Sequence, residues 1–333
     1  MDREQQSKSG EERLIDLFRT VAKAPGAFGL LDDAAVVTPP PGSDVVLKTD
    51  AIVGGVHFFA DDPGDAVAKK ALRVNLSDLA AKGAEPLGFL LTLALPASME
   101  ENWLKEFARG LKEDADNFGC PLFGGDTDRT PGPVTISIAA FGHVPHGRMV
   151  RRAGATPGDL LVVTGTIGDA SLGLKLRRTP GDPIFKKVDA AGRAHFAERY
   201  LLPQPRNAIA LAIREHASAS IDISDGLAGD VAKLAAVSGV AVSLDARQVP
   251  LSAGARAALN VEPRLIELIL SGGDDYEIAA AVPASRLSAL RESARVAGIE
   301  LTTIGRIEKG DGIAVTGLDG KPLSLSRGSF SHF

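Results

Sequence analysis

One stretch in the first half of the sequence reads Val74-Asn75-Leu76-Ser77-Asp78-Leu79-Ala80-Ala81-Lys82-Gly83-Ala84. It closes a helix predicted over residues 65–82, because Gly83 is a typical C-terminal stop and Pro86 follows just beyond. The apolar run at residues 88–95 then predicts a buried strand. Asp78 stands out, because aspartate has a poor helix propensity and its neighbours in this helix are apolar.

Predicted helices and strands alternate along the rest of the chain. Helices are predicted over residues 11–24, 65–82, 98–118, 207–216, 225–238, 262–270 and 284–297, and strands over 45–49, 88–95, 121–123, 134–144, 160–164, 220–223, 240–245, 276–282, 301–307 and 312–316. A capping box of Ser98 and Glu101, and a cap by Ser224 or Asp225, are expected at two helix starts. Residues 178–191 are polar, contain several Gly and Pro, and predict a loop.

Strands and helices therefore alternate in both halves of the chain, and two domains are predicted. Residues 1–10 are expected to be a disordered tail, residues 11–147 the N-terminal domain, and residues 148–333 the C-terminal domain. The boundary falls in a segment rich in Gly, Pro and Arg. No predicted strand leads into a Rossmann or P-loop glycine motif, so a nucleotide would have to bind through a different motif.

The composition excludes several classes of protein. The 37 Lys and Arg residues and 42 Asp and Glu residues give a net charge of −5. The chain therefore lacks the net positive charge that is typical of proteins that bind nucleic acid or an anionic membrane. The single cysteine, Cys120, excludes an internal disulfide. The start of the chain lacks the apolar region of a secretory signal, and no apolar run is long enough for a membrane span. We therefore expect a cytoplasmic protein that binds neither nucleic acid nor membrane.

Aspartates recur where predicted strands and helices end. They are Asp32, Asp33, Asp50, Asp126, Asp222, Asp225, Asp274 and Asp275. Each one alone is explained as a helix cap or a turn residue. Together they form a set of oxygen ligands of the kind that Mg²⁺ shares with phosphates, and the glycines beside them let a phosphate approach backbone N–H groups. The pattern predicts a polyphosphate site with several Mg²⁺ ions.

Seven of these motifs occur in an order that resembles the thiamine-monophosphate kinase family, within the aminoimidazole ribonucleotide synthetase superfamily. They are Asp32-Asp33-Ala34-Ala35-Val36 after Gly29, Thr49-Asp50, His57-Phe58, residues 74–84, Gly124-Gly125-Asp126-Thr127, residues 221–227 and residues 271–277. The resemblance covers about residues 11–333. The ending Phe330-Ser331-His332-Phe333 is similar to the aromatic-x-His-Phe ending of this family.

The resemblance implies ATP-dependent phosphorylation of thiamine monophosphate to thiamine diphosphate, by direct in-line transfer of the γ-phosphate, with ADP as the other product. It implies the fold class α+β, with an N-terminal α+β domain that binds ATP and Mg²⁺ and a C-terminal α/β domain. It also implies a homodimer in which the N-terminal domains pair into a shared β-barrel. The implied Mg²⁺ ligands are Asp33, Thr49, Asp50, Asp78, Asp126, Asp222 and Asp225. The implied ATP contacts are Gly125, Asp126, Arg152 and Ser224, and the implied substrate contacts are His57, Asp274 and Phe330. No general base is implied, because the acceptor phosphate is already anionic at neutral pH; a requirement for K⁺ is left open.

Three positions depart from the family pattern. Leu31 replaces a usual glycine before Asp32. Lys48 stands where a serine often ligates a metal; a charged lysine cannot ligate Mg²⁺, so either only its backbone carbonyl serves or one metal position is altered. Asp274 stands where the longer glutamate is common, so its reach to a substrate is shorter.

Two alternatives remain. One is another ATP-dependent enzyme of the same superfamily, similar to aminoimidazole ribonucleotide synthetase or selenophosphate synthetase; the second of these typically carries a reactive cysteine in an N-terminal glycine-rich segment, where this chain has none. The other is a non-catalytic nucleotide-binding protein, for which aligned carboxylates would not be needed. Mg²⁺-dependent turnover separates the two.

Overall fold

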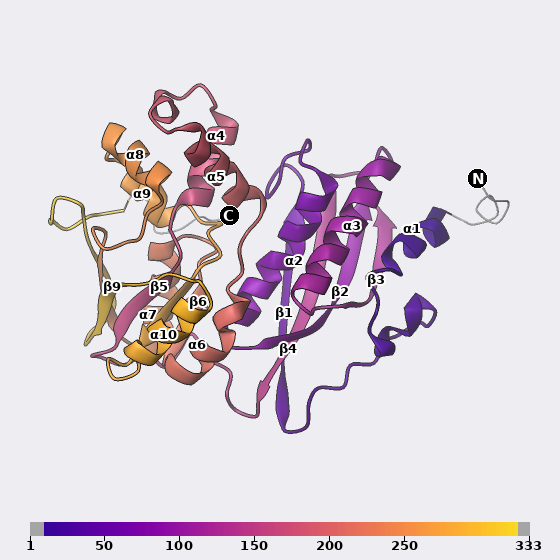
Figure 1. Cartoon of the computed structure of the whole chain (residues 1–333), viewed down its shortest axis with the longest axis horizontal. Coiled ribbons are helices and arrows are strands. Elements are labelled where there is room, and N and C mark those ends of the chain that lie inside the picture. Colours follow the sequence, from indigo (N-terminus) through magenta and orange to yellow (C-terminus); the bar gives the residue numbers. More distant parts are fainter. Residues whose placement is uncertain (1–9, 326–333) are drawn as a thin grey trace. The chain divides into compact units, whose positions relative to one another are not determined.

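The computed structural model describes residues 10–325 and divides the chain into two compact units (Figure 1). The first unit runs from the start of the described chain to Leu79 and continues over Glu85–Gly147, and the second contains Ala80–Ala84 and the residues from Arg148 onward. Each unit has its own sheet, so the fold is a mixed α/β fold of two domains. The predicted tail lies outside the described residues except for Gly10, which begins the first helix.

The first unit is built on a four-stranded sheet in the order β1-β4-β2-β3. Its strands are β1 (Ser43–Val53), β2 (Glu85–Leu95), β3 (Leu122–Arg129) and β4 (Thr135–Pro145). Strand β4 pairs antiparallel with β1 and β2, and β3 pairs parallel with β2. Helices α2 (Gly64–Ala81) and α3 (Glu101–Asn117) lie over one side of the sheet in Figure 1. Helix α1 (Gly10–Phe18) packs against α3, and η1 (Pro25–Leu30) packs against β3.

Burial alternates along β1 and distinguishes the two faces of this sheet. Val46 and Ile52 are buried, whereas Leu47 is 77% exposed. Because successive side chains of a strand point to opposite faces, Val46, Lys48, Asp50 and Ile52 share the face covered by the helices, here called the helix face. Leu47 and Thr49 share the other, the open face. The first unit therefore offers two different surfaces for chemistry.

The second unit contains a six-stranded sheet in the order β10-β7-β9-β5-β8-β6. Its strands are β5 (Leu160–Thr164), β6 (Ala219–Asp222), β7 (Ala241–Asp245), β8 (Ile278–Val282), β9 (Leu301–Glu308) and β10 (Gly312–Thr316). Its helices are α4 (Asp169–Arg178), α5 (Ala190–Leu201), α6 (Ala210–His216), α7 (Leu227–Ser238), α8 (Ala253–Val261), α9 (Leu265–Ser271) and α10 (Leu287–Val296), with short turns η2 (Pro183–Lys186) and η3 (Asn207–Ile209). Strand β8 is buried along its whole length, because alternate residues join hydrophobic clusters on opposite faces of the sheet.

Several predicted boundaries are wrong in an instructive way. Helix α5 begins at Ala190, inside the segment predicted as a loop over residues 178–191, because the Asp189 carboxylate accepts a hydrogen bond from Gly192 N at 2.7 Å. Helix α8 was also missed. Its N-cap is Ser252, whose hydroxyl accepts from Ala255 N. Local capping therefore decides these helices more than their weak hydrophobic periodicity.

The expected caps are wrong at two other helices. The N-cap of α3 is Glu100, whose side chain makes no capping hydrogen bond, and that of α7 is Gly226, which has no side chain to make one. The predicted helix over residues 11–24 ends at Phe18. The short strand predicted at residues 121–123 extends to Arg129, because it pairs with β2 along most of its length. The glycine pair before Asp126 is therefore part of β3 and does not follow it.

Candidate functional site

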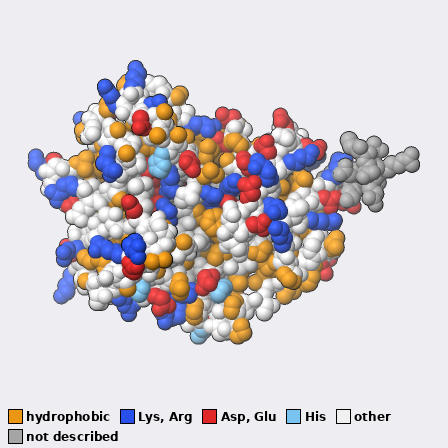
Figure 2. Space-filling model, viewed as in Figure 1, with side chains coloured by type: hydrophobic (Ala, Val, Ile, Leu, Met, Phe, Trp, Pro, Cys, Tyr) orange, Lys and Arg blue, Asp and Glu red, His pale blue; other side chains and the backbone are white. Residues whose placement is uncertain are grey.

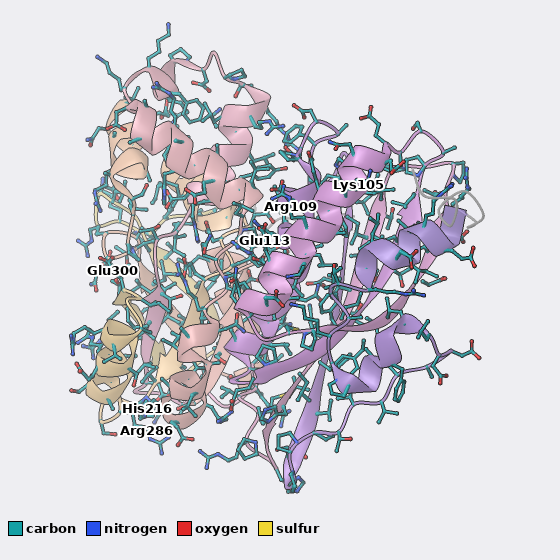
Figure 3. The ribbon with its side chains drawn as sticks, turned by 45° about the vertical axis from the view of Figure 1, so that its right-hand side comes forward. Lys105, Arg109, Glu113, His216, Arg286 and Glu300 are labelled. Atoms are coloured by element: carbon teal, nitrogen blue, oxygen red, sulfur yellow. The ribbon has the colours of Figure 1, made fainter. Side chains whose placement is uncertain are left out.

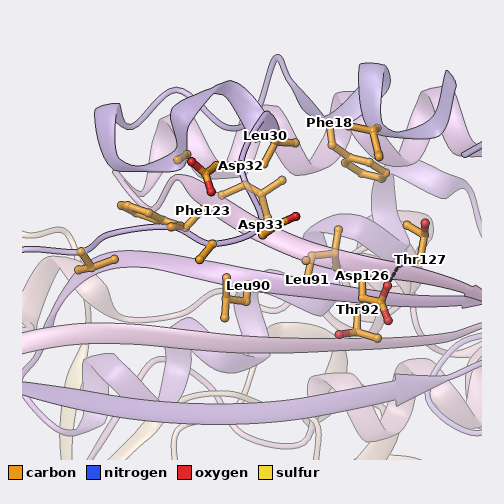
Figure 4. A pocket seen from close by; sticks show the side chains of 18 of the residues that line it. Phe18, Leu30, Asp32, Asp33, Leu90, Leu91, Thr92, Phe123, Asp126 and Thr127 are labelled. Atoms are coloured by element: carbon orange, nitrogen blue, oxygen red, sulfur yellow. Dashed lines mark hydrogen bonds between the residues drawn. The ribbon is translucent and has the colours of Figure 1, made fainter. Parts of the chain in front are cut away.

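A cavity of about 730 Å³ opens on the first unit (Figure 4). Asp33, Gly125 and Asp126, three residues singled out in the sequence, line it together with Asp32. Apolar side chains supply much of the remaining wall, among them Phe18, Leu30, Leu90, Phe123 and Phe141. An apolar chamber with a few carboxylates along its wall suits a ligand that has both a ring and a charged group.

Strand pairing places this cavity on the open face. Asp126 pairs with Thr92, and Thr92 pairs with Ser137 of β4. Asp50 pairs with Ile138, the next residue of β4, which is fully buried. Since adjacent residues of a strand face opposite sides, Asp126 and Asp50 lie on opposite faces of the sheet. The predicted metal ligands of the first unit thus form two groups.

Gly125 is required by the way β3 meets β2. A Cβ atom at this position would lie 1.9 Å from the backbone oxygen of Leu91, a distance that no side chain tolerates. At Gly124 the nearest atom to such a Cβ is a Leu90 methyl group at 3.6 Å, an ordinary contact. The glycine that the sequence assigned to phosphate approach therefore has a packing role as well.

The second group of ligands, on the helix face, is held together by a lysine. Lys48 Nζ lies 2.7 Å from Asp78 Oδ2 and 3.0 Å from Asp50 Oδ1. The Asp78 side chain is only 12% exposed and that of Lys48 26%. Burial alone would lower the pKa of Lys48, but the two carboxylates outweigh it, and the pKa lies above its usual value. The ammonium is charged at neutral pH and neutralises part of the charge of this pair.

Thr49 and His57 are placed near this pair with different orientations. The Thr49 side chain points to the open face, opposite to the side chain of Asp50. His57 Nδ1 accepts a hydrogen bond from Val53 N at 3.0 Å, which fixes the ring at the end of β1. The His57 carbonyl in turn accepts from Lys70 Nζ at 2.9 Å.

In the second unit, Asp222 ends β6 and is 3% exposed. The loop after it is held by Asp230 of α7, whose Oδ2 accepts from Ser224 N at 3.0 Å and Asp225 N at 2.9 Å. Lys233 Nζ bridges Asp225 at 2.5 Å and Asp230 at 2.8 Å. Burial raises the pKa of Asp230 in spite of this ion pair. Asp230 and Lys233 were not predicted as site residues, although Asp230, like Asp78, is an aspartate inside a largely apolar helix.

Asp274 lies beside this loop. Its N–H donates to the Ser224 carbonyl at 2.8 Å, and its φ of 64° is in the left-handed region, which costs energy for a non-glycine residue. Tyr276, at φ 50°, donates from its N–H to the Ile223 carbonyl. At Gly273 a Cβ would lie 2.4 Å from the Ser224 carbonyl oxygen. The predicted substrate segment and the predicted metal loop of this unit are therefore packed together.

Beneath this segment lies a buried charged network. Asp275 accepts from Gly168 N with both carboxylate oxygens, and complete burial raises its pKa well above the usual range. Arg199 and Arg206 both donate to the Glu277 carboxylate. These contacts fix the start of β8 and hold Asp274 in its strained conformation.

Other predicted residues are not drawn into these groups. Arg152 is exposed, and its carbonyl accepts from Ser238 Oγ at 3.1 Å. Phe330 lies outside the described residues. Within residues 10–325, no three His, Cys, Asp or Glu side chains are grouped as ligands of one metal ion.

On the face drawn in Figure 2, the described residues form no patch of a single charge. On the face in Figure 2, Lys and Arg side chains are interspersed with Asp and Glu. Lys105, Arg109 and Glu113 follow one another along α3 (Figure 3), where Arg109 and Glu113 form an i,i+4 ion pair. In the part of the chain that the structure describes, every helix is too short or too polar to cross a membrane.

Comparison with known proteins gives consistent matches. Residues 31–144 match the family described as AIR synthase related protein, N-terminal domain, and residues 156–317 match its C-terminal domain. A thiamine-monophosphate kinase of Caulobacter vibrioides is 43% identical over 325 residues, 96% of this chain and 90% of that protein. The crystal structure of a thiamine-monophosphate kinase from Stenotrophomonas maltophilia has a TM-score of 0.81 at 36% identity, covering 94% of this chain and 96% of that one. AaThiL complexed with AMPPCP and TMP has a TM-score of 0.76 at 30% identity, covering 100% and 99%.

Proposed function

The chain belongs to the thiamine-monophosphate kinase family of AIR synthase related proteins, and from this premise we propose that it phosphorylates thiamine monophosphate to thiamine diphosphate at the expense of ATP. The observation that carries the proposal is the cavity on the open face, where Asp33, Gly125 and Asp126 meet an apolar wall. The relative that binds AMPPCP, an ATP analogue, together with TMP supports both substrates.

We infer that Mg²⁺ accompanies ATP, and the donor chemistry of the open face fits it. Asp33 and Asp126 are exposed carboxylates beside a chamber large enough for a nucleotide, and hard oxygen ligands shared with phosphates are what Mg²⁺ prefers. Asp222 and Asp225 would supply further carboxylates in the second unit. The Asp50–Asp78 pair fits less well, because the Lys48 ammonium lies between these carboxylates.

The reaction needs charge neutralisation more than proton transfer. The acceptor is a phosphate monoester with a second pKa of about 6, largely dianionic at neutral pH, so no general base is required. Two unit charges at 4 Å repel by about 4 kcal/mol at an effective dielectric of 20, and several meet here. When bound, Mg²⁺ would offset this repulsion and orient the phosphates for in-line transfer. We assign ATP contacts to Gly125, Asp126, Arg152 and Ser224, and substrate contacts to His57, Asp274 and Phe330.

We further propose a homodimer that pairs through the β1 side of the open face. Leu47 is 77% exposed there, and Val45 on the same face of β1 is 43% exposed. An apolar surface of this kind is typical of an interface, and joining two such sheets would complete the expected barrel. Leu47→Lys is expected to convert a dimer into a monomer in light scattering; a wild-type chain that is already monomeric would exclude this interface.

A product assay tests the function directly. The chain is incubated with ATP and Mg²⁺ and with thiamine monophosphate, formylglycinamidine ribonucleotide or selenide in parallel, and the products are identified by mass spectrometry. Thiamine diphosphate and ADP, formed only with Mg²⁺, are expected in the first reaction. Turnover only with another substrate would move the chain to a sister activity, and no turnover with nucleotide binding intact would favour a non-catalytic binding protein.

A further inference from the structure

The geometry points to a specific role for Lys48: its ammonium takes the place of one divalent cation between Asp50 and Asp78, so this chain binds one metal ion fewer than the same chain without the lysine. The inference depends on the proposed function only in treating these two aspartates as part of a metal-dependent site. It rests on three features of the first unit, which are distance, placement and charge.

The distances leave room for one cation between the two carboxylates. Lys48 Nζ lies within hydrogen-bonding distance of an oxygen of each, at 2.7 and 3.0 Å. A Mg²⁺ ion bridging the same oxygens would lie about 2.1 Å from each of them. Because the ammonium contacts both carboxylates, it occupies the space between them, and a divalent ion could not bind the same two oxygens at the same time.

The placement of Lys48 shows that it is built into the fold. It lies in the middle of β1, between the buried residues Val46 and Ile52 of the same face. Asp78 comes from α2, so the ion pair joins a strand to the helix that covers it. Both side chains are mostly withdrawn from solvent, at 26% and 12% exposure. A lysine held in this way differs from the mobile lysines of the exposed surface.

The charge of the cluster supports the same role. Two carboxylates that share one partner repel each other, most strongly where one of them, Asp78, is mostly buried, and a cation between them offsets this repulsion. The ammonium supplies one positive charge where a divalent ion would supply two. Removing it should therefore leave a pair of carboxylates that attracts a metal ion.

The test counts bound metal ions, with Mn²⁺ as the probe. Free Mn²⁺ is measured by electron paramagnetic resonance during titration of the full chain, first alone and then with AMPPCP. Lys48→Ser is short and neutral and offers an oxygen ligand; we expect it to bind one more Mn²⁺ per chain than the wild type. Lys48→Arg keeps the cation and should bind the wild-type number. Lys69→Ser is the matched control, since Lys69 pairs with Glu113 at 2.7 Å in the same unit, away from the predicted ligands.

Thermal unfolding provides a second measurement. Lys48→Ser should unfold at a lower temperature than the wild type in EDTA and recover most of that loss with Mn²⁺, because a ligand that binds only the folded state stabilises it. Lys48→Gln keeps a donor for the carboxylates and guards against misfolding of the serine variant; it should gain an ion as well. Equal Mn²⁺ counts in the wild type, Lys48→Ser and Lys48→Gln would overturn the inference.

The count involves no turnover, so the two proposals can fail separately. A missing thiamine diphosphate product with an extra ion in Lys48→Ser would remove only the proposed function. Normal kinase activity with unchanged ion counts would remove only the role of Lys48.

Discussion

The two faces of the first sheet carry the same kind of side chain in opposite settings. On the open face, Asp33 and Asp126 are exposed and line a cavity. On the helix face, Asp50 and Asp78 are joined by Lys48 in a largely enclosed ion pair. The two settings are one residue apart along β4. Asp50 pairs with Ile138 of β4, and Asp126 pairs with Thr92 of β2, which in turn pairs with Ser137 of β4. A carboxylate that binds an external cation has to remain accessible, whereas one that meets an internal cation contributes to the fold.

The largest effect should follow from changing the open face. Asp126→Asn keeps the shape of the side chain and removes its charge, and we expect kcat to fall by about 10³-fold, a loss typical of removing one strong electrostatic contact from a reaction site. The melting temperature should stay unchanged, because Asp126 is exposed. Asp128→Asn, two residues along the same strand and also exposed, is the control. Near-wild-type turnover in Asp126→Asn would remove this residue from the site.

The next effect concerns the packing that supports the open face. Gly125→Ala places a Cβ against the Leu91 oxygen, so β3 has to move away from β2. Overpacking of this kind costs about 2–3 kcal/mol, which urea unfolding monitored by circular dichroism should detect. Gly124→Ala meets only a methyl group at 3.6 Å and should cost much less. Equal stability of the two variants would show that β3 can move away from β2 at Gly125 at little cost in free energy.

A smaller effect is expected on the helix face. Asp78→Asn leaves Lys48 with a single carboxylate partner, and we expect a loss of about 1.5 kcal/mol in the free energy of unfolding, the lower end of the range for a hydrogen bond to a charged group. Measurements in EDTA exclude a contribution from metal. Asp50→Asn should cost less, since the Asp50 side chain is 40% exposed and that of Asp78 only 12%. The reverse order would show that Asp50 anchors the lysine.

Much of this arrangement could be predicted from the sequence, and the failures have physical causes. Asp78 was singled out because aspartate has a poor propensity for the interior of an apolar helix. Lys48 was singled out because it stands where the family often has a serine ligand, and a charged lysine cannot ligate Mg²⁺. The separation of Asp50 from Asp126 was not foreseen, since both were taken to end strands. In the structure both lie inside longer strands, whose lengths depend on pairing with β4 and β2.

The second unit shows the same limit in another form. Asp222 was correctly placed at the end of a strand. A side chain of Ser224 or Asp225 was expected to cap α7, but the N-cap is Gly226, and the N–H groups of Ser224 and Asp225 donate to Asp230. Such a contact depends on the side chain one turn into the helix, and a motif that ends at residue 227 does not contain it. The helices α5 and α8 were missed because small and polar residues weaken their periodicity.

The smallest effect should come from an ion pair of identical length on the outer surface. Lys105 Nζ lies 2.7 Å from Glu101 Oε1 on α3, the same separation as between Lys48 and Asp78. The Lys105 side chain is 57% exposed and that of Glu101 is 79% exposed, so water and salt screen the attraction between the two charges. Glu101→Gln should leave the urea midpoint unchanged, whereas Asp78→Asn lowers it. If both variants were equally destabilised, burial would not be what distinguishes the lysine on the helix face from the lysine on the surface, and distance alone would account for both ion pairs.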